Sequence, residues 1–235
     1  MTQEEVKKQL GFRAADDLIR NGMKIGLGTG STAVWAVRRL GMLYYDGKVN
    51  DILAVPTSSQ TEMECQEQGI PLRSMNDPEI NGSLDLTIDG VDQIDGSGCM
   101  TKGGGGALLI EKIVAYASKK MAVVADHSKL TDALGLSFPI PLEVLPEARI
   151  PVLNTLKEMN TQPRVRMAVK KMGAVITDNG NLIIDVTLRE VWNPEELDRE
   201  FSRIPGVLGN GLFTRIKPLL YIGDSGGNIE IRDFN

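Results

Sequence analysis

Apolar side chains near the start of the chain follow helical spacing. From Val6 to Leu18 they recur about every four residues, and Thr2 with Glu5 forms a capping-box pattern in front of them. The chain is therefore expected to begin with an amphipathic helix that buries one face.

Short apolar runs then alternate with helical patterns. The predicted strands cover 23–27, 52–55, the region around 70–73, 84–89 and 121–125, and the predicted helices cover 33–40 and 58–68. This alternation favours an α/β fold with a doubly wound, mostly parallel sheet, in which ligands bind at the carboxyl ends of the strands. The loops at 28–32, 89–92 and 126–129 each follow such a strand end, so we expect them to meet on one edge of the sheet.

The pattern changes from about Pro139, where several prolines mark a boundary. A helix is predicted near 151–159, a strand near 165–169, a hairpin over 174–186 with its turn at 178–181, and a helix that starts at Asn193-Pro194. These elements predict a small α+β domain of antiparallel strands at 136–207. Segments 207–214 and 219–222 are expected to return to the larger sheet, so that 1–135 plus 208–235 form the main domain.

The composition limits the classes of function. The 235 residues carry a formal net charge of −5, and Lys and Arg are scattered, so no basic surface for nucleic acid is expected. No apolar run approaches the roughly 18 residues that a membrane helix needs, and the N-terminus lacks a signal-peptide core. We therefore expect a cytoplasmic protein that acts on a small molecule, with no nucleic-acid or membrane partner.

Cysteine and histidine are too rare for several common chemistries. Cys65 and Cys99 lie far apart and have no Cys or His neighbour at metal-binding spacing, so both are expected to be reduced structural thiols. His127 is the only histidine, which disfavours a serine-type triad and a histidine-bound metal. Catalysis, if present, is expected to depend on carboxylates and lysines, and no cofactor is expected.

Four consecutive glycines, Gly103 to Gly106, form the strongest candidate for a functional site. Such a run costs conformational entropy, which indicates that its backbone lies close to a ligand. Lys102 precedes the glycines, and segment 107–110 predicts the start of a helix whose N–H groups face an anion. Glu111, one turn further, would supply a base. A flexible hinge beside an ordinary helix is the alternative, and helical projection leaves the burial of Glu111 open.

A second glycine loop, at 26–31, superficially resembles a dinucleotide-binding fingerprint. Ser31 stands at the third glycine position, and the strand that ends before Thr57 lacks the acidic residue that would bind a ribose diol. We therefore expect no nicotinamide cofactor. Ser31 and Thr32 instead predict helix caps whose hydroxyls and amides hold a single phosphate, with plain capping as the alternative.

Charged side chains follow two of the other predicted strands. Asp89 and Asp92 come after a buried strand, and crowding of the two carboxylates would let one act as an acid while the other accepts hydrogen bonds. A metal site at this position would lack further ligands. Lys129 follows the strand at 121–125 and is suited to bind a phosphate, although an ordinary surface lysine is the simpler alternative.

Four motifs, in the same order, resemble those of the type A ribose-5-phosphate isomerase family. They are Gly28-Thr29-Gly30-Ser31-Thr32, Asp89-Gly90-Val91-Asp92, Lys102 through Gly106 with Glu111-Lys112, and Asp126-His127-Ser128-Lys129. The similarity continues at 1–8, 177–181 and 204–207 and so spans nearly the whole chain. The resemblance implies a Rossmann-like main domain, an inserted ferredoxin-like domain, and a homodimer or homotetramer.

The resemblance also implies an activity and a set of site residues. The reaction is the metal-independent interconversion of ribose 5-phosphate and ribulose 5-phosphate through an enediolate, in the non-oxidative branch of the pentose phosphate pathway. Glu111 would be the proton-shuttling base. Asp89, Asp92 and Lys102 would assist ring opening and polarise the oxygens at C1 and C2. The residues implied to bind the sugar phosphate are Lys7, Thr29, Gly30, Ser31, Thr32, Asp89, Gly90, Val91, Asp92, Lys102, Gly103, Gly104, Gly105 and Lys129.

Three positions depart from the family pattern. Gln93 stands where Glu is usual, Ile110 stands where Arg often precedes the glutamate, and His127 replaces a small or acidic residue. None of these removes a proposed catalytic group. Two rival functions stay open: an amino-sugar-phosphate deaminase, for whose acid–base histidine His127 is a poor candidate, and a non-catalytic sugar-phosphate sensor, which would not need Lys102, Glu111 and the aspartates together.

Overall fold

The computed structural model describes residues 1–234, and the chain divides into two compact units. The first unit contains residues 1–91, 113–129 and the chain from Arg215 onward, and the second contains 92–112 and 130–214. This division differs from the predicted boundaries because 92–112, 130–135 and 208–214 belong to the second unit. None of the helices within residues 1–234 has the length and apolar character needed to cross a membrane.

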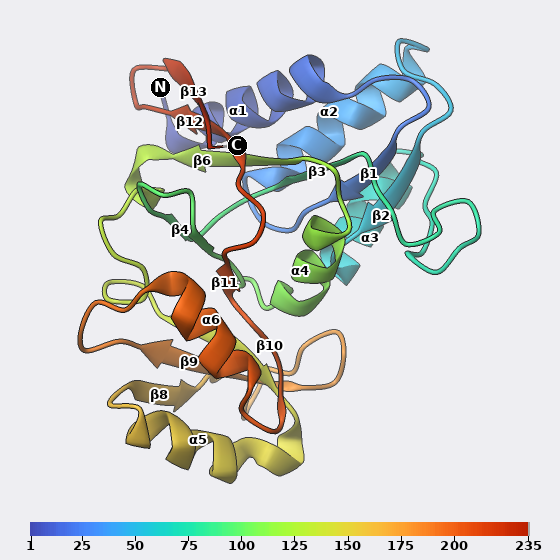
Figure 1. Cartoon of the computed structure of the whole chain (residues 1–235). Helices are drawn as coiled ribbons and strands as arrows, with labels where there is room; N and C mark the ends of the chain where they lie inside the picture. Colours follow the sequence, from blue (N-terminus) through green and yellow to red (C-terminus); the bar gives the residue numbers. More distant parts are fainter. Residues whose placement is uncertain (235) are drawn as a thin grey trace. The chain divides into compact units, whose positions relative to one another are not determined.

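The first unit is built on a six-stranded, mostly parallel sheet (Figure 1). Its strands are β1 (Lys24–Leu27), β2 (Leu53–Pro56), β3 (Leu86–Asp89), β6 (Met121–Asp126), β12 (Leu219–Gly223) and β13 (Ile229–Asp233). Their order is β13-β12-β6-β3-β1-β2, and only the edge strand β13 runs antiparallel to its neighbour. The predicted doubly wound sheet is confirmed. The prediction of a strand near 70–73 is wrong, since this segment makes only an isolated bridge between Ala54 and Leu72.

Helices α1 and α2 cover one face of this sheet (Figure 1). The helices of the first unit are α1 (Gln3–Leu18), α2 (Ala33–Tyr45) and α3 (Ser59–Glu67). Thr2 and Glu5 form the predicted capping box in front of α1. Leu10 of α1 and Leu40 of α2 share one buried core with Ile25 of β1, so the apolar face of each helix is what holds it on the sheet.

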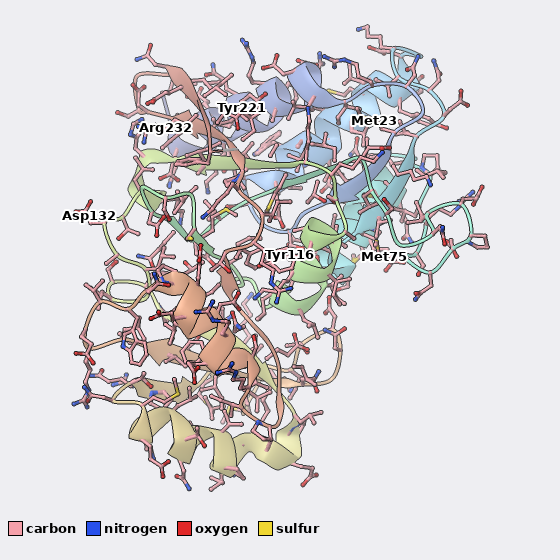
Figure 2. All side chains as sticks on the ribbon, in the orientation of Figure 1. Met23, Met75, Tyr116, Asp132, Tyr221 and Arg232 are labelled. Carbon is pink, nitrogen blue, oxygen red and sulfur yellow. The ribbon has the colours of Figure 1, made fainter. Side chains whose placement is uncertain are left out.

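Helix α1 is fixed both to α2 and to the sheet. A Cβ added at Gly11 would lie 2.6 Å from the Cβ of Trp35, so glycine is what allows the two helices to approach this closely. Tyr221 of β12, labelled in Figure 2, is buried. Its hydroxyl donates to Asp17 of α1 at 3.3 Å. Burial, with the nearby Asp17 carboxylate, raises the pKa of Tyr221 to about 12. The phenol therefore stays neutral and keeps this link at ordinary pH.

The second unit contains a four-stranded antiparallel sheet covered by two helices. Its elements are β7 (Ile140–Val144), α5 (Arg149–Glu158), β8 (Gln162–Val165), β9 (Leu182–Thr187), α6 (Pro194–Ser202) and β10 (Val207–Asn210). Their order along the chain is βαββαβ and their spatial order is β10-β7-β9-β8, which is the ferredoxin-like arrangement. The predicted small α+β domain is confirmed, although the strand expected at 165–169 is instead β8, at 162–165.

A buried carboxylate fixes the predicted turn at 178–181. Glu143 of β7 is fully buried, and its Oε1 accepts hydrogen bonds from Thr177 Oγ1 at 2.9 Å and from Asn181 Nδ2 at 2.8 Å. The prediction that a hairpin strand precedes this turn is wrong, because 174–181 contributes only isolated bridges. The side chains of the turn therefore hold it in place where a ladder of backbone hydrogen bonds was expected.

The second unit also contains a three-stranded sheet that the sequence pattern did not predict. Its strands are β4 (Gln93–Ile94), β5 (Met100–Thr101) and β11 (Leu212–Phe213). The expectation that 207–214 returns to the larger sheet is wrong, since 207–210 pairs with β7 and 212–213 pairs with β5. Only 219–223 joins the larger sheet, as β12. The remaining elements are α4 (Leu108–Tyr116) and the 3-10 turns η1 (His127–Lys129) and η2 (Pro146–Ala148).

Candidate active site

The loop after β1 closes around the carboxylate of Asp89, at the end of β3. Asp89 is fully buried, and its Oδ1 accepts hydrogen bonds from Thr29 N at 3.1 Å and from Gly90 N at 2.7 Å. A Cβ added at Gly28 would lie only 1.9 Å from Asp89 Oδ1, so this approach of backbone to carboxylate requires glycine. Asp89 thereby orders the predicted phosphate loop.

Hydroxyl groups gather on the other side of the same loop. Thr29 Oγ1 lies 2.7 Å from Ser58 Oγ, 2.8 Å from Thr57 Oγ1 and 3.2 Å from Thr61 Oγ1. These partners come from the end of β2 and the start of α3, and none was predicted as a site residue. Thr57 and Ser58 follow a strand end, the signal that pointed to the other loops, so the same rule could have found them.

The hydroxyls at 31 and 32 do not cap α2, so the prediction of side-chain caps is wrong. Thr32 is the N-cap residue, but its backbone is helical and its side chain makes no capping hydrogen bond. The first turn is closed by backbone instead, with Val34 N donating to Gly30 O at 3.1 Å. Ser31 Oγ accepts a hydrogen bond from Lys7 Nζ of α1 at 2.9 Å. A lysine from the first helix therefore lies at the predicted phosphate loop.

The chain turns sharply after β6, where Lys129 was predicted to bind phosphate. Asp126 Oδ1 accepts a hydrogen bond from Ser128 N at 2.9 Å, which folds the segment into η1 and leaves Lys129 half-buried. Burial pushes the pKa of Asp126 upward, but the hydrogen bonds from Ser128 and the charge of Lys129 outweigh burial and hold this pKa below its usual value. Because β6, β3 and β1 are parallel neighbours, their carboxyl ends share one edge, as predicted for this unit.

In the second unit, Lys102 and Glu111 form a buried ion pair. Lys102 Nζ lies 3.5 Å from Glu111 Oε2, and the two residues are only 2% and 4% exposed. Lys102 follows β5, Glu111 lies in the first turn of α4, and the ring centre of Phe213 is 5.5 Å from Lys102 Nζ. The alternative of a surface glutamate is therefore wrong. A charge buried this deeply needs a counter-ion, and each residue supplies one for the other.

The four glycines connect these two charges through a tight backbone turn. Gly103 and Gly106 have φ values of +102° and +88°, which side-chain-bearing residues rarely adopt, and Gly106 N donates to Gly103 O at 2.9 Å. Gly104 N donates to Asp92 Oδ2 at 2.7 Å, and a Cβ added at Gly104 would lie 2.6 Å from Asp92 Oδ1. Each of the two aspartates therefore holds a different glycine loop by accepting a hydrogen bond from its backbone. Asp89 binds the loop after β1, and Asp92 binds the tetraglycine loop.

The three departures from the family pattern fall in different surroundings. Gln93 is buried, and it donates to Ser137 Oγ at 2.9 Å and accepts from Gly135 N at 3.1 Å, so it fixes the neighbouring loop. Ile110 is half-buried on α4, and His127 is exposed. Lys112, next to Glu111, is held by Asp198 Oδ1 at 3.3 Å and by Asn210 Oδ1 at 3.1 Å.

The cysteines are buried, free thiols, as predicted. Burial, assisted by the charges of Glu64 and Glu62, raises the pKa of Cys65 to about 12, so that thiol stays protonated and unreactive. Within residues 1–234, His, Cys, Asp and Glu side chains form no group of three or more placed to hold a metal ion.

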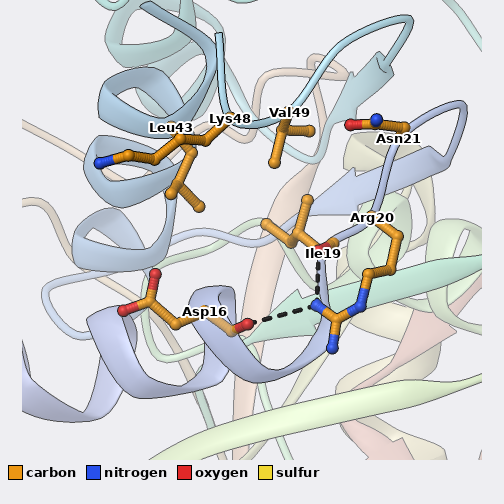
Figure 3. A pocket seen from close by; sticks show the side chains of 7 residues that line it. All are labelled: Asp16, Ile19, Arg20, Asn21, Leu43, Lys48 and Val49. Carbon is orange, nitrogen blue, oxygen red and sulfur yellow. Dashed lines mark hydrogen bonds between the residues drawn. The ribbon is translucent and has the colours of Figure 1, made fainter. Parts of the chain in front are cut away.

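A pocket of about 500 Å³ lies in the first unit, and none of the predicted site residues lines it (Figure 3). The residues that line it are Asp16, Ile19, Arg20, Asn21, Leu43, Lys48 and Val49. Arg20 donates to the carbonyls of Asp16 at 3.2 Å and of Ile19 at 2.7 Å, so its guanidinium caps the end of α1. Its lining residues come from the end of α1 and the chain before β1, and from the end of α2 and the chain before β2, whereas the predicted phosphate loop follows the carboxyl end of β1.

These features together define a class of protein, an α/β enzyme equipped for acid–base chemistry on a small anionic molecule. They are the doubly wound sheet with glycine loops at its strand ends, the ferredoxin-like unit and the buried carboxylate–ammonium pair. A family model described as ribose 5-phosphate isomerase A (phosphoriboisomerase A) matches residues 53–227. The chain belongs to the ribose-5-phosphate isomerase A family, which interconverts ribose 5-phosphate and ribulose 5-phosphate.

Individual relatives extend this similarity over the full length of the chain. Ribose-5-phosphate isomerase A of Treponema denticola is 46% identical over 237 residues, which cover 98% of this chain and 99% of the relative. A solved D-ribose-5-phosphate isomerase in complex with phospho-erythronic acid is 36% identical with a TM-score of 0.93, and covers 99% of this chain and 100% of its own. The enzyme of Methanocaldococcus jannaschii is 36% identical with a TM-score of 0.91, at the same coverage.

Proposed function

We propose that Glu111 carries the proton between C2 and C1 of the sugar phosphate, without a metal ion. The observation that carries this assignment is the burial of Glu111 3.5 Å from the ammonium of Lys102. In the open-chain aldose, the carboxylate takes the proton from C2 and the carbonyl oxygen O1 becomes negative. Part of the protons held by Glu111 exchange with solvent at the enediolate stage. Glu111 then delivers a proton to C1, while the hydroxyl proton moves from O2 to O1, which gives the ketose. Positioned acid–base groups of this kind contribute about 10²–10⁴-fold in rate.

Lys102 is the proposed counter-ion at every stage of this transfer. Before reaction it faces the Glu111 carboxylate at 3.5 Å. When Glu111 accepts the proton, the negative charge moves to the enediolate oxygen, so the ammonium exchanges one anionic partner for another and no charge is left buried alone. Such preorganised electrostatic stabilisation is usually the largest contribution to catalysis.

Gly105 is the proposed amide donor to the enediolate. The amide of Gly104 already donates to Asp92 Oδ2 at 2.7 Å, which commits that N–H to holding the loop. Gly103 and Gly104 then shape the site through their backbone. We propose that Asp92, together with Asp89, assists ring opening by exchanging a proton with the sugar hydroxyls, in addition to holding the glycine loops.

The phosphate end of the substrate is proposed to bind at the loop after β1. Thr29, Gly30, Ser31 and Thr32 offer amides and hydroxyls at the start of α2, and Lys7 adds a positive charge 2.9 Å from Ser31 Oγ. Lys129, at the neighbouring strand end, adds a second charge, and Gly90 and Val91, which follow β3, are proposed to contact the sugar. Phospho-erythronic acid, present in a related isomerase, is a phosphorylated acid of the kind that this arrangement would bind.

We also propose that the enzyme works in the cytoplasm as a homodimer or homotetramer, with the sugar phosphate as its partner rather than nucleic acid or a membrane. The net charge of −5 supports the expectation that neither nucleic acid nor a membrane is a partner, because a surface for either would require a basic field. Sedimentation equilibrium would distinguish the dimer from the tetramer, and a monomer would contradict both.

Deuterium exchange tests the proposed reaction directly. The purified protein is incubated in deuterium oxide with ribose 5-phosphate and a chelator, and the sugars are read by NMR. We expect deuterium at C2 of the recovered aldose and at C1 of the ketose. Binding of phospho-erythronic acid without exchange would instead support a sensor. Exchange that stops with chelator and resumes with added metal would contradict the metal-independent mechanism.

A further inference from the structure

Arg166, which follows β8 in the ferredoxin-like unit, binds the backbone of the tetraglycine loop. Its Nη1 donates to Gly103 O at 2.9 Å and to Gly104 O at 3.0 Å. Its Nε donates to Asp185 Oδ2 of β9 at 2.8 Å, and its Nη2 donates to Asp185 Oδ1. The guanidinium is thus held in a fixed plane by a two-point ion pair while it holds two successive carbonyls.

These contacts fix the direction of two peptide groups. A trans peptide is planar, so its C=O and N–H point in opposite directions. The carbonyl of Gly103 faces Arg166, and the N–H of the same peptide, on Gly104, donates to Asp92 Oδ2 at 2.7 Å. The carbonyl of Gly104 also faces Arg166, so the N–H of Gly105 is turned away from the arginine. Arg166 therefore sets the orientation of the amide that faces the enediolate in the proposed function.

We propose that Arg166 is a positioning residue for the isomerase reaction, and that Asp185 orients it. The proposal rests on the proposed function, because it acts through the glycine loop between Lys102 and Glu111. It also gives the ferredoxin-like unit a part in catalysis, since β8 and β9 supply the two side chains that hold the loop. Glycines are flexible, so without this clamp the two peptides would sample other orientations.

The two side chains suit a positioning role better than a surface ion pair. The side chains of Arg166 and Asp185 are only 16% and 21% exposed, so water competes weakly for their contacts. Lysine could not reproduce the arrangement, because one ammonium cannot form a two-point pair with Asp185 and also reach both carbonyls in a fixed plane. Positioning errors of about 1 Å at a reacting centre can cost about 100-fold in rate.

Kinetics of Arg166→Lys, Arg166→Ala and Asp185→Asn test the proposal. We expect kcat to fall about 10- to 100-fold for the arginine variants and less for Asp185→Asn, with KM changed less than about threefold, since the phosphate loop is untouched. Added guanidinium at tens of millimolar should restore part of the kcat of Arg166→Ala, whereas equal concentrations of sodium chloride or urea should not. An unchanged kcat, or a rise in KM alone, would overturn the proposal.

Arg38→Lys and Arg38→Ala are the matched controls. Arg38 also forms a two-point pair, with Glu64 at 2.8 and 3.1 Å, but this pair joins α2 to α3 in the first unit. We expect these variants to keep kcat within about twofold, with no response to guanidinium, as for a surface pair. Equal losses of kcat in the two series would show that general destabilisation is responsible and would overturn the proposal.

A readout that does not depend on turnover separates this proposal from the proposed function. Amide NMR of Gly104 and Gly105 reports the loop itself, and we expect both amides to shift and exchange faster in Arg166→Lys than in wild type. Unchanged amides would overturn the positioning role even if the wild type is an active isomerase. Conversely, a wild type without deuterium exchange would contradict the proposed function, while altered amides would still support the clamp.

Discussion

Lys102 Nζ lies 3.5 Å from Glu111 Oε2, and the two side chains are almost completely buried. They are separated along the chain by the four glycines and the first residues of α4. The short strand β5 positions the lysine and the helix positions the glutamate, so the pair depends on the turn that the glycines make. Removing either charge would leave the other buried without its partner.

A single substitution in this pair is expected to destabilise the second unit more than a double one. Lys102→Met leaves the Glu111 carboxylate buried, and breaking a buried pair costs about 3–5 kcal/mol. Lys102→Met with Glu111→Leu removes both charges and should recover much of that loss, although the enzyme stays inactive. Urea unfolding measures both effects, and a double variant less stable than the single one would contradict the expectation.

Glu111→Gln should abolish exchange while sparing binding. The amide keeps the shape of the side chain but cannot accept the C2 proton, so kcat should fall by about 10²–10⁴-fold. The affinity for phospho-erythronic acid, measured by calorimetry, should change little. Glu158→Gln on the exposed side of α5 is the matched control and should retain full activity. Substantial exchange by Glu111→Gln would show that another base operates.

The sequence predicts well those features that neighbouring residues determine. Thr2 and Glu5 are three residues apart, so the capping box of α1 is a local property and was found correctly. The loop at 28–32 and Asp89 were found because a parallel sheet brings strand ends to one edge. The same rule applied to β2 would have included Thr57 and Ser58.

Features that depend on distant segments were not predictable. β4, β5 and β11 have two residues each, which is too short for a periodic pattern, and β11 lies more than 100 residues after β5. The burial of Glu111 was open because its helix position borders both the apolar and the polar face of the predicted helix. The contact with Lys102 is what shows it to be buried. Arg166 contacts a glycine 63 residues away, and no local signal marks it.

Gly28→Ala is expected to disrupt the phosphate loop. The new Cβ would lie 1.9 Å from Asp89 Oδ1, so the carboxylate must move and lose its hydrogen bonds from Thr29 N and Gly90 N. Overpacking of this kind costs about 1–3 kcal/mol, and KM should rise because the loop is displaced. Gly96→Ala, where an added Cβ meets nothing within 4 Å, should leave stability and KM unchanged. Normal kinetics in Gly28→Ala would show that Asp89 is not needed in this position.

Asp85 should contribute stability that depends on pH. The hydrogen bond from Lys119, with that from Lys24 N, holds the pKa of Asp85 below its usual value of 3.8. A lowered pKa stabilises the fold at pH values above 3.8, and this contribution is lost as the pH falls through the lower, folded-state value. Asp85→Asn should therefore be less stable than wild type at pH 7 and equally stable in strong acid. Urea unfolding across pH measures this, and a difference between variant and wild type that persists undiminished in strong acid would contradict the expectation.

Lys7→Met should weaken substrate binding with little change in kcat. Lys7 Nζ lies 2.9 Å from Ser31 Oγ, at the loop proposed to hold the phosphate, whereas the chemistry is assigned to Glu111. Loss of a charged hydrogen bond corresponds to an increase of about 10-fold in KM. The difference from wild type should shrink as salt is raised, because salt screens the attraction to phosphate.

Lys8→Met is the matched control for this last change, because it removes the same charge one residue further along α1. Lys8 is exposed, and its Nζ lies over the rings of Phe12 and Trp35 at 5.5 and 5.6 Å, away from Ser31. Its KM should stay within about twofold of wild type, as for an exposed charge with no specific partner in the reaction. Equal effects of the two substitutions would mean that only the overall charge of α1 attracts the substrate, and a large fall in kcat for Lys7→Met would place this lysine in the chemistry itself.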